Sequence, residues 1–553
     1  MLHNPLVFSL LLNLLFAMLC LGIGGFHYGA IDDYFMASII TGAYGGEFDA
    51  HTLFVNGIYA YFLKPFYILF PSVGWYFIFE LFVVFLSFWG VTYLLLRKVP
   101  GAMGLFLAVF ILACSAPDFY MDLCFTQCAA VLTAAGALFL YFGYTEQKKN
   151  FLLVGFLAMV AGIIFRREAF LSGMPFLFAL LCYGFWKYRN VNKITVAVLV
   201  ALVGAYFALQ SFNKNLFVQK DYSYYLDYQT PRAILGDGAY YDSQNVYDEL
   251  EERGMSGRDF ELLERWVFYD KNTFSLDSIR PIVDIALRNK YDLNYAKLPV
   301  ALFLAVAKSF FCTYAWCWAV LCLLFFYLSP AKACKYTWGV LALICVCLSF
   351  LLLQNRIVHY VETGIWLYAI ICAIPLMNSE EFGKMKSNRK IPYLCMALSF
   401  FCLVFSLQNS RTIENSPIFF GKPKVSEDWK GLLDHVETHP DNVYLMPFSY
   451  YKGFGLFKDP AYRSTAPGSL GNVIPIGYWN INLPGMEIEM KRRGVENPLH
   501  DVLHDNVYLM DDYNGLHLER FYERHYHTAI DADTVARFGE IKLLKFHIAG
   551  DEL

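Results

Sequence analysis

Long apolar runs dominate this sequence and constrain its fold more than any other feature. The chain has 553 residues, of which 57% are hydrophobic and 17% charged, whereas soluble domains are about a quarter charged. A membrane is the natural solvent for so many apolar side chains, in keeping with a mean hydropathy of +0.40. About eleven runs approach the roughly 20 residues that a helix needs to cross a bilayer. They lie at 5–25, 73–96, 101–116, 123–143, 151–165, 169–186, 194–212, 299–328, 337–353, 361–377 and 391–408.

These runs predict an α-helical polytopic membrane protein with about 11 transmembrane helices. The first run has no Lys or Arg before it and no A-x-A cleavage motif after it. We therefore expect it to be a retained helix and not a cleaved signal. The net charge is only -4 and no long basic run occurs, which argues against nucleic acid as a partner.

Cysteine placement indicates the compartment. All 14 cysteines fall between Cys20 and Cys402, and the two long polar segments, 213–298 and 409–553, contain none. No Asn-x-Ser/Thr acceptor occurs either, so neither disulfides nor glycosylation supports a eukaryotic lumenal setting. We expect a multi-pass protein of the bacterial plasma membrane.

Positive charge is distributed unevenly over the links between the runs. Alternate links carry 13 Lys and Arg residues, and the opposite short links carry four. By the positive-inside rule, this bias predicts a cytoplasmic N-terminus and an extracytoplasmic C-terminus. The thirteen are Arg97, Lys98, Lys148, Lys149, Lys187, Arg189, Lys193, Lys332, Lys335, Lys384, Lys386, Arg389 and Lys390, and the four are Lys64, Arg166, Arg167 and Arg356.

The predicted orientation places every candidate functional feature on the outer face. We divide the chain into a transmembrane domain, 1–408, and an extracytoplasmic α/β domain, 409–553. The transmembrane domain includes two outer loops, 26–72 and 213–298. Any chemistry should therefore take place outside the cytoplasm.

The outer segments have helix and strand patterns of their own. Helix-like patterns at 34–41 and 55–69 fit amphipathic helices that lie in the membrane interface. In the last domain, the hexapeptide Asp-Asn-Val-Tyr-Leu-Met occurs at 441–446 and again at 505–510, each time with turn formers before a strand-like run. We expect two similar strands in one small α/β sheet. Further helices are predicted at 258–268, 429–438 and 487–493.

Two adjacent acids, Asp32 and Asp33, follow the first predicted helix in Ile-Asp-Asp-Tyr-Phe-Met. A carboxylate that faces lipid without a partner is costly, so two acids at the outer membrane surface suggest a function. Neighbouring residues on a helix point in different directions, so at most one should reach a reacting atom. Helix capping at a water boundary is the structural alternative.

Arg166 and Arg167 break the charge bias, because they lie between two apolar runs on the predicted outer face. A guanidinium recognises phosphate with two parallel hydrogen bonds and keeps its charge, so this pair suits a lipid-linked phosphate. Snorkelling to ordinary lipid headgroups stays open as an alternative. Arg356 and His359 share another short outer link and would either add a second cation or anchor that link to the interface.

Further candidates are contacts to a sugar or an acceptor. Arg232 and Trp266 stand among many tyrosines in the segment 213–298, and aromatic faces with polar neighbours can stack on sugar rings. Tyr34 and His51 in the first outer loop join this set, and interfacial anchoring is the alternative for the aromatic residues. His435 and His439 are four residues apart but lack a third ligand, so we expect a surface helix and no metal site.

The constellation resembles the GT-C superfamily of integral membrane glycosyltransferases. The resemblance rests on the acid pair after the first helix, an outer loop with interfacial helices, a later arginine pair and a C-terminal outer domain. It covers the membrane portion loosely, and its one short motif is specific only through its position. No Walker A, G-x-S-x-G or C-x-x-C motif occurs, so ATPase, hydrolase and thiol-redox classes lose their usual markers.

The resemblance implies an inverting glycosyltransferase that uses a polyprenyl-phosphate-linked sugar donor. Asp32 or Asp33 would be the catalytic base, and Arg166, Arg167 and Arg356 would hold the donor phosphate. The acceptor would be an extracytoplasmic envelope glycan, lipid or protein. No cofactor is required, although a divalent cation fits some members. The sugar and the acceptor stay open.

Three other classes of protein fit parts of the same pattern. A transporter or flippase of a lipid-linked saccharide would have ionisable groups at mid-membrane and paired broken helices, and Lys308 is the one obvious mid-run charge in the eighth predicted helix. A polysaccharide polymerase or ligase would not need the acid pair. A non-enzymatic scaffold would use the last domain as its binding module.

Overall fold

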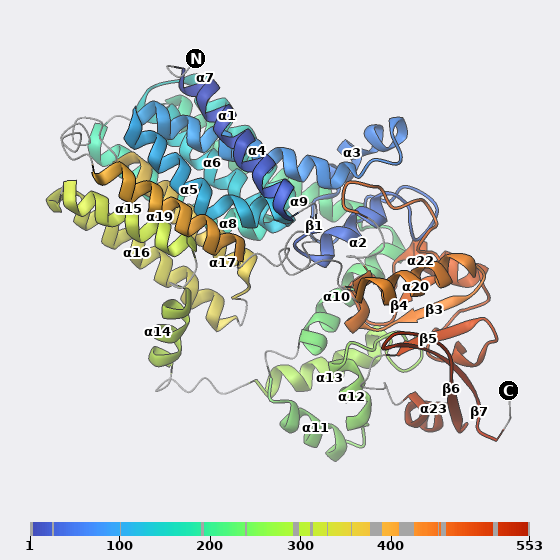
Figure 1. The fold of residues 1–553 in the computed structure, drawn as a ribbon. Helices are drawn as coiled ribbons and strands as arrows, with labels where there is room; N and C mark the ends of the chain where they lie inside the picture. Colours follow the sequence, from blue (N-terminus) through green and yellow to red (C-terminus); the bar gives the residue numbers. More distant parts are fainter. Residues whose placement is uncertain are drawn as a thin grey trace.

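The computed structural model is mostly helical, with a helix bundle at one end and a mixed sheet at the other (Figure 1). It describes residues 4–24, 27–99, 101–189, 193–237, 241–290, 298–309, 313–328, 330–354, 357–376, 390–408, 425–451, 453–454, 460–511 and 518–550.

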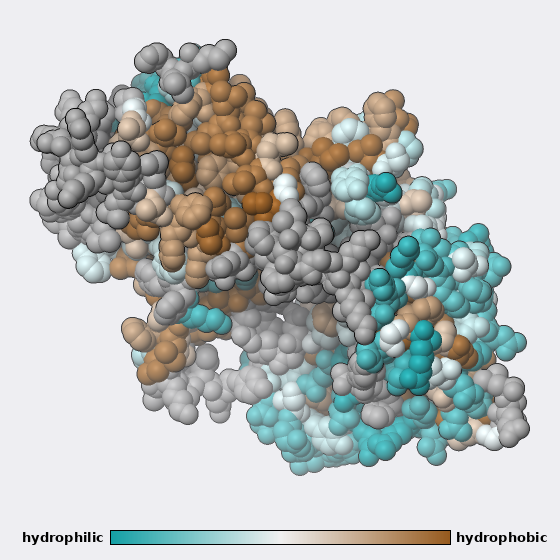
Figure 2. All heavy atoms as spheres, viewed as in Figure 1, coloured by the Kyte–Doolittle hydropathy of each residue, from teal (hydrophilic) through white to brown (hydrophobic). Residues whose placement is uncertain are grey.

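Seven helices in the described part of the chain are long and apolar enough to cross a membrane. Figure 2 shows a largely hydrophobic surface over this bundle and a largely hydrophilic one over the sheet region. Large apolar side chains project from the bundle, for example Phe178 (69% exposed) and Val200 (66%), so lipid and not water suits this surface. The protein is therefore built as a polytopic membrane protein. The seven helices are α1 (Pro5–Gly24), α4 (Trp75–Lys98), α5 (Ala102–Met121), α6 (Phe125–Thr145), α8 (Arg167–Tyr188), α9 (Lys193–Leu216) and α16 (Pro330–Leu353).

Shorter apolar helices occupy the other predicted runs, with one difference. The run 299–328 is not a single helix, because α14 (Leu298–Ser309) ends before α15 (Thr313–Leu328) begins. At 1.5 Å per residue, α14 is only about 18 Å long and cannot cross a bilayer alone. Lys308 consequently lies at the end of a short helix and is exposed. The remaining helices are α7 (Lys149–Phe165), α17 (His359–Ala373), the 3-10 turn η1 (Ile374–Leu376) and α19 (Lys390–Gln408).

Helix α6 lies at the centre of the bundle, with every residue from Phe125 to Tyr144 buried. Small residues bring α7 close against it: a Cβ on Gly155 would lie 2.8 Å from the backbone N of Leu140. Such small residues let helices pack closely in lipid, where no hydrophobic effect draws them together. The first residue of α6, Phe125, contacts Arg166 at the junction of α7 and α8, so the central helix fixes one wall of the site described below.

The segment 26–72 contains α2 (Ile31–Ile40) and α3 (Gly57–Leu69), which confirms both predicted helices. α3 exposes large apolar side chains such as Phe62 (51%) and Ile68 (71%), as expected of a helix at the membrane interface. α2 does not lie on a surface, because all its residues from Asp33 onward are buried. A short strand before it, β1 (His27–Tyr28), pairs in parallel with β2 (Asp122–Leu123).

After the end of α9, the described residues of the segment 213–298 form four helices, α10 (Lys220–Asp237), α11 (Ser243–Glu252), α12 (Gly257–Glu264) and α13 (Leu276–Arg288). The Ser256 side chain caps α12 by accepting a hydrogen bond from the backbone N of Asp259. α12 ends before Trp266, whose φ of 61° lies in the left-handed region. The helix predicted at 258–268 is thus shorter than expected.

The last domain forms a five-stranded sheet in the order β4-β3-β5-β7-β6. The repeated hexapeptide supplies neighbouring parallel strands in register, with Val443 opposite Val507 and Tyr444 opposite Tyr508, which confirms the prediction of two similar strands in one sheet. The elements are α20 (Val425–Thr438), β3 (Val443–Met446), η4 (Phe448–Tyr450), β4 (Val473–Pro475), α22 (Pro484–Arg492), η5 (Asp501–Leu503), β5 (Val507–Asp511), α23 (Leu518–Tyr526), β6 (Ile530–Phe538) and β7 (Ile541–Ile548).

The segment 213–298 and the last domain pack tightly on each other. The backbone N of Phe268 donates to the carbonyl of Ile476 over 2.7 Å. A Cβ at Gly477 would lie 1.4 Å from the Trp266 carbonyl oxygen, so only glycine fits there. The last domain also covers α2, where the Ser38 and Thr465 hydroxyls lie 3.2 Å apart. The segment 213–298, α2 and the last domain therefore form one packed unit at the end of the bundle.

Candidate functional site

Asp32 and Asp33 occupy the first turn of α2 and point to different surroundings, as predicted. Ala30 is the N-cap residue, so neither acid is the N-cap, although both lie in the first turn, where a negative charge favours the helix dipole. Asp32 faces the last domain, where its Oδ1 accepts a hydrogen bond from Trp479 Nε1 over 2.8 Å and another from the Tyr478 hydroxyl. The last domain thus holds Asp32 in place.

Asp33 is fully buried at the end of the helix bundle. Its Oδ1 accepts a hydrogen bond from the Tyr76 hydroxyl over 2.9 Å and a longer one from the backbone N of Phe125 over 3.3 Å. The buried carboxyl of Glu80 lies close enough to act on Asp33, although neither of its oxygens has a hydrogen-bond partner among the described residues. Two carboxylates buried near each other repel, so such a pair favours a state in which at least one of them carries a proton. Asp33 therefore belongs to a buried pair of carboxyl groups inside the protein.

The electrostatics separate the two aspartates further. Burial raises the pKa of Asp33 well above its usual range, and the charge of Asp32 adds to the rise. Burial also raises the pKa of Asp32, but the hydrogen bonds from Tyr478 and Trp479 and the charges of Arg166 and Arg232 oppose that rise. The pKa of Asp32 is therefore raised less than that of Asp33, so Asp32 is the aspartate that more readily carries a charge.

Arg166 lies at the junction of α7 and α8, between the membrane helices and Asp32. Its guanidinium lies 5.1 Å from the ring centre of Phe54 and 5.2 Å from that of Phe125, and its Nε contacts Glu168 at 3.0 Å. Trp479, which donates to Asp32, packs against the same Phe54 ring, so the early acid and the later arginine lie in one part of the molecule, linked through two aromatic rings. Planar stacking on two rings suits arginine and not lysine.

Arg167 is more exposed than Arg166, with 57% of its side chain accessible against 25%. Its Nε contacts Glu168 at 2.5 Å and its Nη1 donates to Gln210 over 3.2 Å. Arg166 and Arg167 therefore share one carboxylate, that of Glu168, so the arginine pair keeps a net positive charge.

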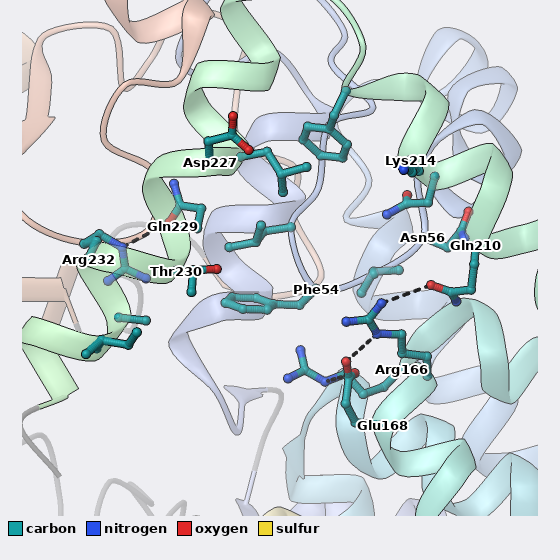
Figure 3. Close-up of a pocket in the computed structure, with 18 of the residues that line it drawn as sticks. Phe54, Asn56, Arg166, Glu168, Gln210, Lys214, Asp227, Gln229, Thr230 and Arg232 are labelled. Atoms are coloured by element: carbon teal, nitrogen blue, oxygen red, sulfur yellow. Dashed lines mark hydrogen bonds and ion pairs between the residues drawn. The ribbon is translucent and has the colours of Figure 1, made fainter. Parts of the chain in front are cut away.

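A cavity of about 1040 Å³ opens beside Arg166. Figure 3 shows Arg166, Glu168 and Gln210 on one wall, Arg232, Gln229 and Thr230 on the opposite wall, and Phe54 between them. Ligand pockets of a few hundred to about 1000 Å³ hold drug-sized molecules, so this cavity has room for a saccharide with its phosphate. Its charged lining residues are five cations and two acids: Arg166, Arg167, Lys214, Arg232, Lys290, Glu168 and Asp227.

Arg232 comes from α10 and lies on the far wall of the cavity. Its side chain is buried, its Nε donates to Gln229 over 3.0 Å, and its guanidinium lies 5.0 Å from the ring centre of Trp266. Trp266 stacks in turn on Phe448, with ring centres 4.6 Å apart. Trp266 is not among the described residues that line the cavity. It contacts Arg232, which does line it.

Asp32, Asp33 and the remaining described candidates are not among the residues that line the cavity. His51 bonds Asp49 over 2.6 Å and stacks on Tyr222, with ring centres 3.4 Å apart, so it ties the segment 26–72 to α10. Tyr34 is buried beneath the last domain. His359 lies 3.0 Å from Asp118 beside the β1–β2 pair. Arg356 lies outside the described residues.

Four site residues were missed in the sequence: Tyr76, Glu80, Tyr478 and Trp479. Glu80 carried a signal, because it is an acid within a predicted membrane span and such residues are rarely without function. Tyr478 and Trp479 resemble many other aromatic residues in this chain and carried none.

Within the described ranges, no group of three or more His, Cys, Asp or Glu side chains is arranged to hold a metal ion. His435 and His439 lie with ring centres 4.3 Å apart on α20, without a third ligand among the described residues.

Comparison with known proteins gives no relative: no family model, no curated protein and no solved structure matches this chain. Its function must therefore be argued from the site.

Proposed function

We propose that this protein is an inverting glycosyltransferase that takes a sugar from a polyprenyl-phosphate donor and moves it to an extracytoplasmic acceptor. The observation that carries the proposal is that Asp32 is linked through Trp479 and Phe54 to Arg166, which lines a large cationic cavity at one end of the bundle. A carboxylate base next to an anion site is what transfer from a phosphate leaving group needs.

Each group has a chemical role in this proposal. Asp32 takes the proton of the acceptor hydroxyl while that oxygen attacks the anomeric carbon of the donor. The bond between the anomeric carbon and the phosphate oxygen breaks, and polyprenyl phosphate leaves with the electron pair. Arg166 and Arg167 stabilise the negative charge that develops on this phosphate. Attack from the face opposite the leaving group inverts the anomeric centre.

The geometry supports Asp32 over Asp33 as the base. Asp33 is fully buried, its carboxyl already accepts hydrogen bonds from Tyr76 and Phe125, and burial raises its pKa well above the usual range. A protonated carboxyl cannot accept the acceptor's proton. Asp33 instead fixes the start of α2 against α4 and α6, and so positions Asp32.

The proposal includes the membrane setting. We place the protein in a bacterial plasma membrane as a GT-C-type enzyme with about eleven spans, its N-terminus in the cytoplasm and its last domain outside. The hydrophobic face of α3 would lie in the outer interface, near the entry of the lipid tail.

The test is release of polyprenyl phosphate from a radiolabelled lipid-linked sugar by the full chain in lipid vesicles, with envelope material as acceptor. We expect release by the wild type and a loss of at least about a hundredfold in Asp32→Asn. Glu252→Gln, an exposed acid on α11, is the control and should keep wild-type activity.

The same experiment separates the alternative classes. Movement of intact lipid-linked sugar across the vesicle membrane, without release of polyprenyl phosphate, would establish a transporter or flippase and overturn the enzyme. Undiminished release by Asp32→Asn would reject the assigned base.

A further inference from the structure

A second cationic hollow lies far from the cavity, between α12 in the segment 213–298 and α23 in the last domain. Both helices lie at the end of the molecule away from the membrane bundle (Figure 1). The hollow measures about 60 Å³. Four arginines line it: Arg258, Arg265, Arg520 and Arg524.

One arginine of the four is held rigidly. Arg524 Nη1 donates to Asp259 Oδ1 over 2.8 Å and also to the Ser256 hydroxyl. The other oxygen of Asp259 contacts His525 Nε2 at 2.9 Å, so both oxygens of this carboxylate already have a partner other than Arg258 or Arg520. The side chain of Phe521, which is 2% exposed, contributes an apolar side to the hollow.

The remaining charge is poorly balanced. Asp259 and Glu261 are the only acids among the eight described residues that line the hollow, against four guanidinium groups. Arg258 and Arg520 are exposed, and within the described part of the chain neither makes a side-chain hydrogen bond or ion pair. Like charges gathered around one hollow repel each other, and a bound anion would relieve that repulsion.

We propose that this hollow is a second anion site, which binds a phosphate group. Guanidinium groups match phosphate oxygens with paired hydrogen bonds. The hollow is far smaller than the cavity beside Arg166, at about 60 Å³ against about 1040 Å³, which suits a phosphate group better than a sugar ring. Its distance from the membrane helices points to an anion in water, either free phosphate or a phosphate carried by a soluble glycan. The proposal does not depend on the glycosyltransferase assignment.

The experiment measures binding of inorganic phosphate to the full chain in lipid nanodiscs by calorimetry. We expect binding to weaken by about tenfold or more in the double variant Arg258→Gln/Arg520→Gln, since each lost charge-assisted hydrogen bond costs about one order of magnitude. The control is Lys430→Gln/Arg537→Gln, which removes the same charge from exposed positions elsewhere on the last domain. Its affinity should stay within about twofold of wild type.

A third variant separates this hollow from the cavity. Arg166→Gln/Arg167→Gln should keep the phosphate binding that the Arg258 and Arg520 changes remove. If phosphate binding is lost only in the Arg166 and Arg167 variant, or if the wild type shows no saturable binding, the proposal is wrong.

The source of the phosphate is distinguished with a second probe, a short glycerol-phosphate polymer. Tighter binding of the polymer than of inorganic phosphate, again lost on changing Arg258 and Arg520, identifies a phosphate carried on a larger molecule. Equal or weaker binding of the polymer identifies free phosphate as the ligand.

Discussion

Trp479 Nε1 donates a hydrogen bond to Asp32 Oδ1 over 2.8 Å, although 447 positions separate the two residues in the sequence. The Trp479 ring also packs edge-on against Phe54, with ring centres 5.3 Å apart, and Phe54 lines the cavity. The last domain therefore contributes directly to the site and is not an appended binding module. A mutation that displaces the last domain should therefore remove the hydrogen bonds that hold Asp32, even though Asp32 itself is unchanged.

Tyr478→Phe should shift the pH dependence of transfer. The Tyr478 hydroxyl donates to Asp32 and lowers the pKa of its carboxyl, so its removal raises that pKa. The base acts only when deprotonated, so the acid limb of kcat/KM should move to higher pH. A pH profile of the transfer rate measures the shift.

The matched control is Tyr93→Phe, on the same helix as Tyr76 but towards its other end. It should leave the profile unchanged. A uniform loss of activity at every pH in Tyr478→Phe would show that the tyrosine has only a packing role.

Arg166→Gln should weaken binding of polyprenyl phosphate by about tenfold to a hundredfold, because it removes a charged donor that lies against two aromatic rings. Arg166→Lys should restore only part of this loss, since an ammonium cannot stack or bind phosphate with two parallel bonds. Arg167→Gln, at the more exposed position, should cost less than Arg166→Gln. Binding of the lipid phosphate in nanodiscs distinguishes the three variants, and equal losses in all three would contradict the separate roles.

Much of the arrangement at this end of the bundle could be predicted from the sequence. The apolar runs mark the membrane helices, and counting them along the chain brings Asp32, Arg166 and the last domain to the same end. The hexapeptide repeat indicates two strands of one sheet because identical strings have identical strand patterns. These predictions depend on periodicity and order along the chain, which are local properties.

The partners of the two aspartates could not be predicted in the same way. Tyr478 and Trp479 reach Asp32 only because the last domain folds back over α2, and no local pattern records such a long-range contact. The break between α14 and α15 was also missed, since a continuous apolar run looks the same whether it forms one helix or two.

Asp33→Asn should remove part of the pH dependence of stability. Burial raises the pKa of Asp33 well above its usual range, so the folded state holds a proton that the unfolded chain releases near the ordinary carboxyl pKa. The stability that this group contributes is complete below that ordinary pKa and is lost as the pH rises towards the folded-state value. The wild type should therefore lose stability relative to Asp33→Asn on going from acid to neutral pH.

Thermal unfolding in detergent at several pH values measures this difference. The control is Asp227→Asn, at an exposed position on the cavity wall. Its stability should change with pH in the same way as that of the wild type. A wild type that gains stability relative to Asp33→Asn as the pH rises would show that Asp33 is charged in the folded protein.

Gly477→Ala should destabilise the contact between the segment 213–298 and the last domain by roughly 2–4 kcal/mol. The new Cβ would lie 1.4 Å from the Trp266 carbonyl oxygen, and the backbone must move to admit it. Since Gly477 precedes Tyr478, transfer activity should fall as well. Gly204→Ala, where a Cβ meets nothing within 4 Å, should be tolerated in the same unfolding and activity assays.

The most direct test of the central claim is a cryo-EM structure of the full chain in nanodiscs with polyprenyl phosphate bound. The account predicts the phosphate in the cavity, with its oxygens within hydrogen-bonding distance of the Arg166 guanidinium, and the Asp32 carboxylate facing the same space. A phosphate bound at the opposite end of the helix bundle, or one separated from Asp32 by the packed core, would contradict it.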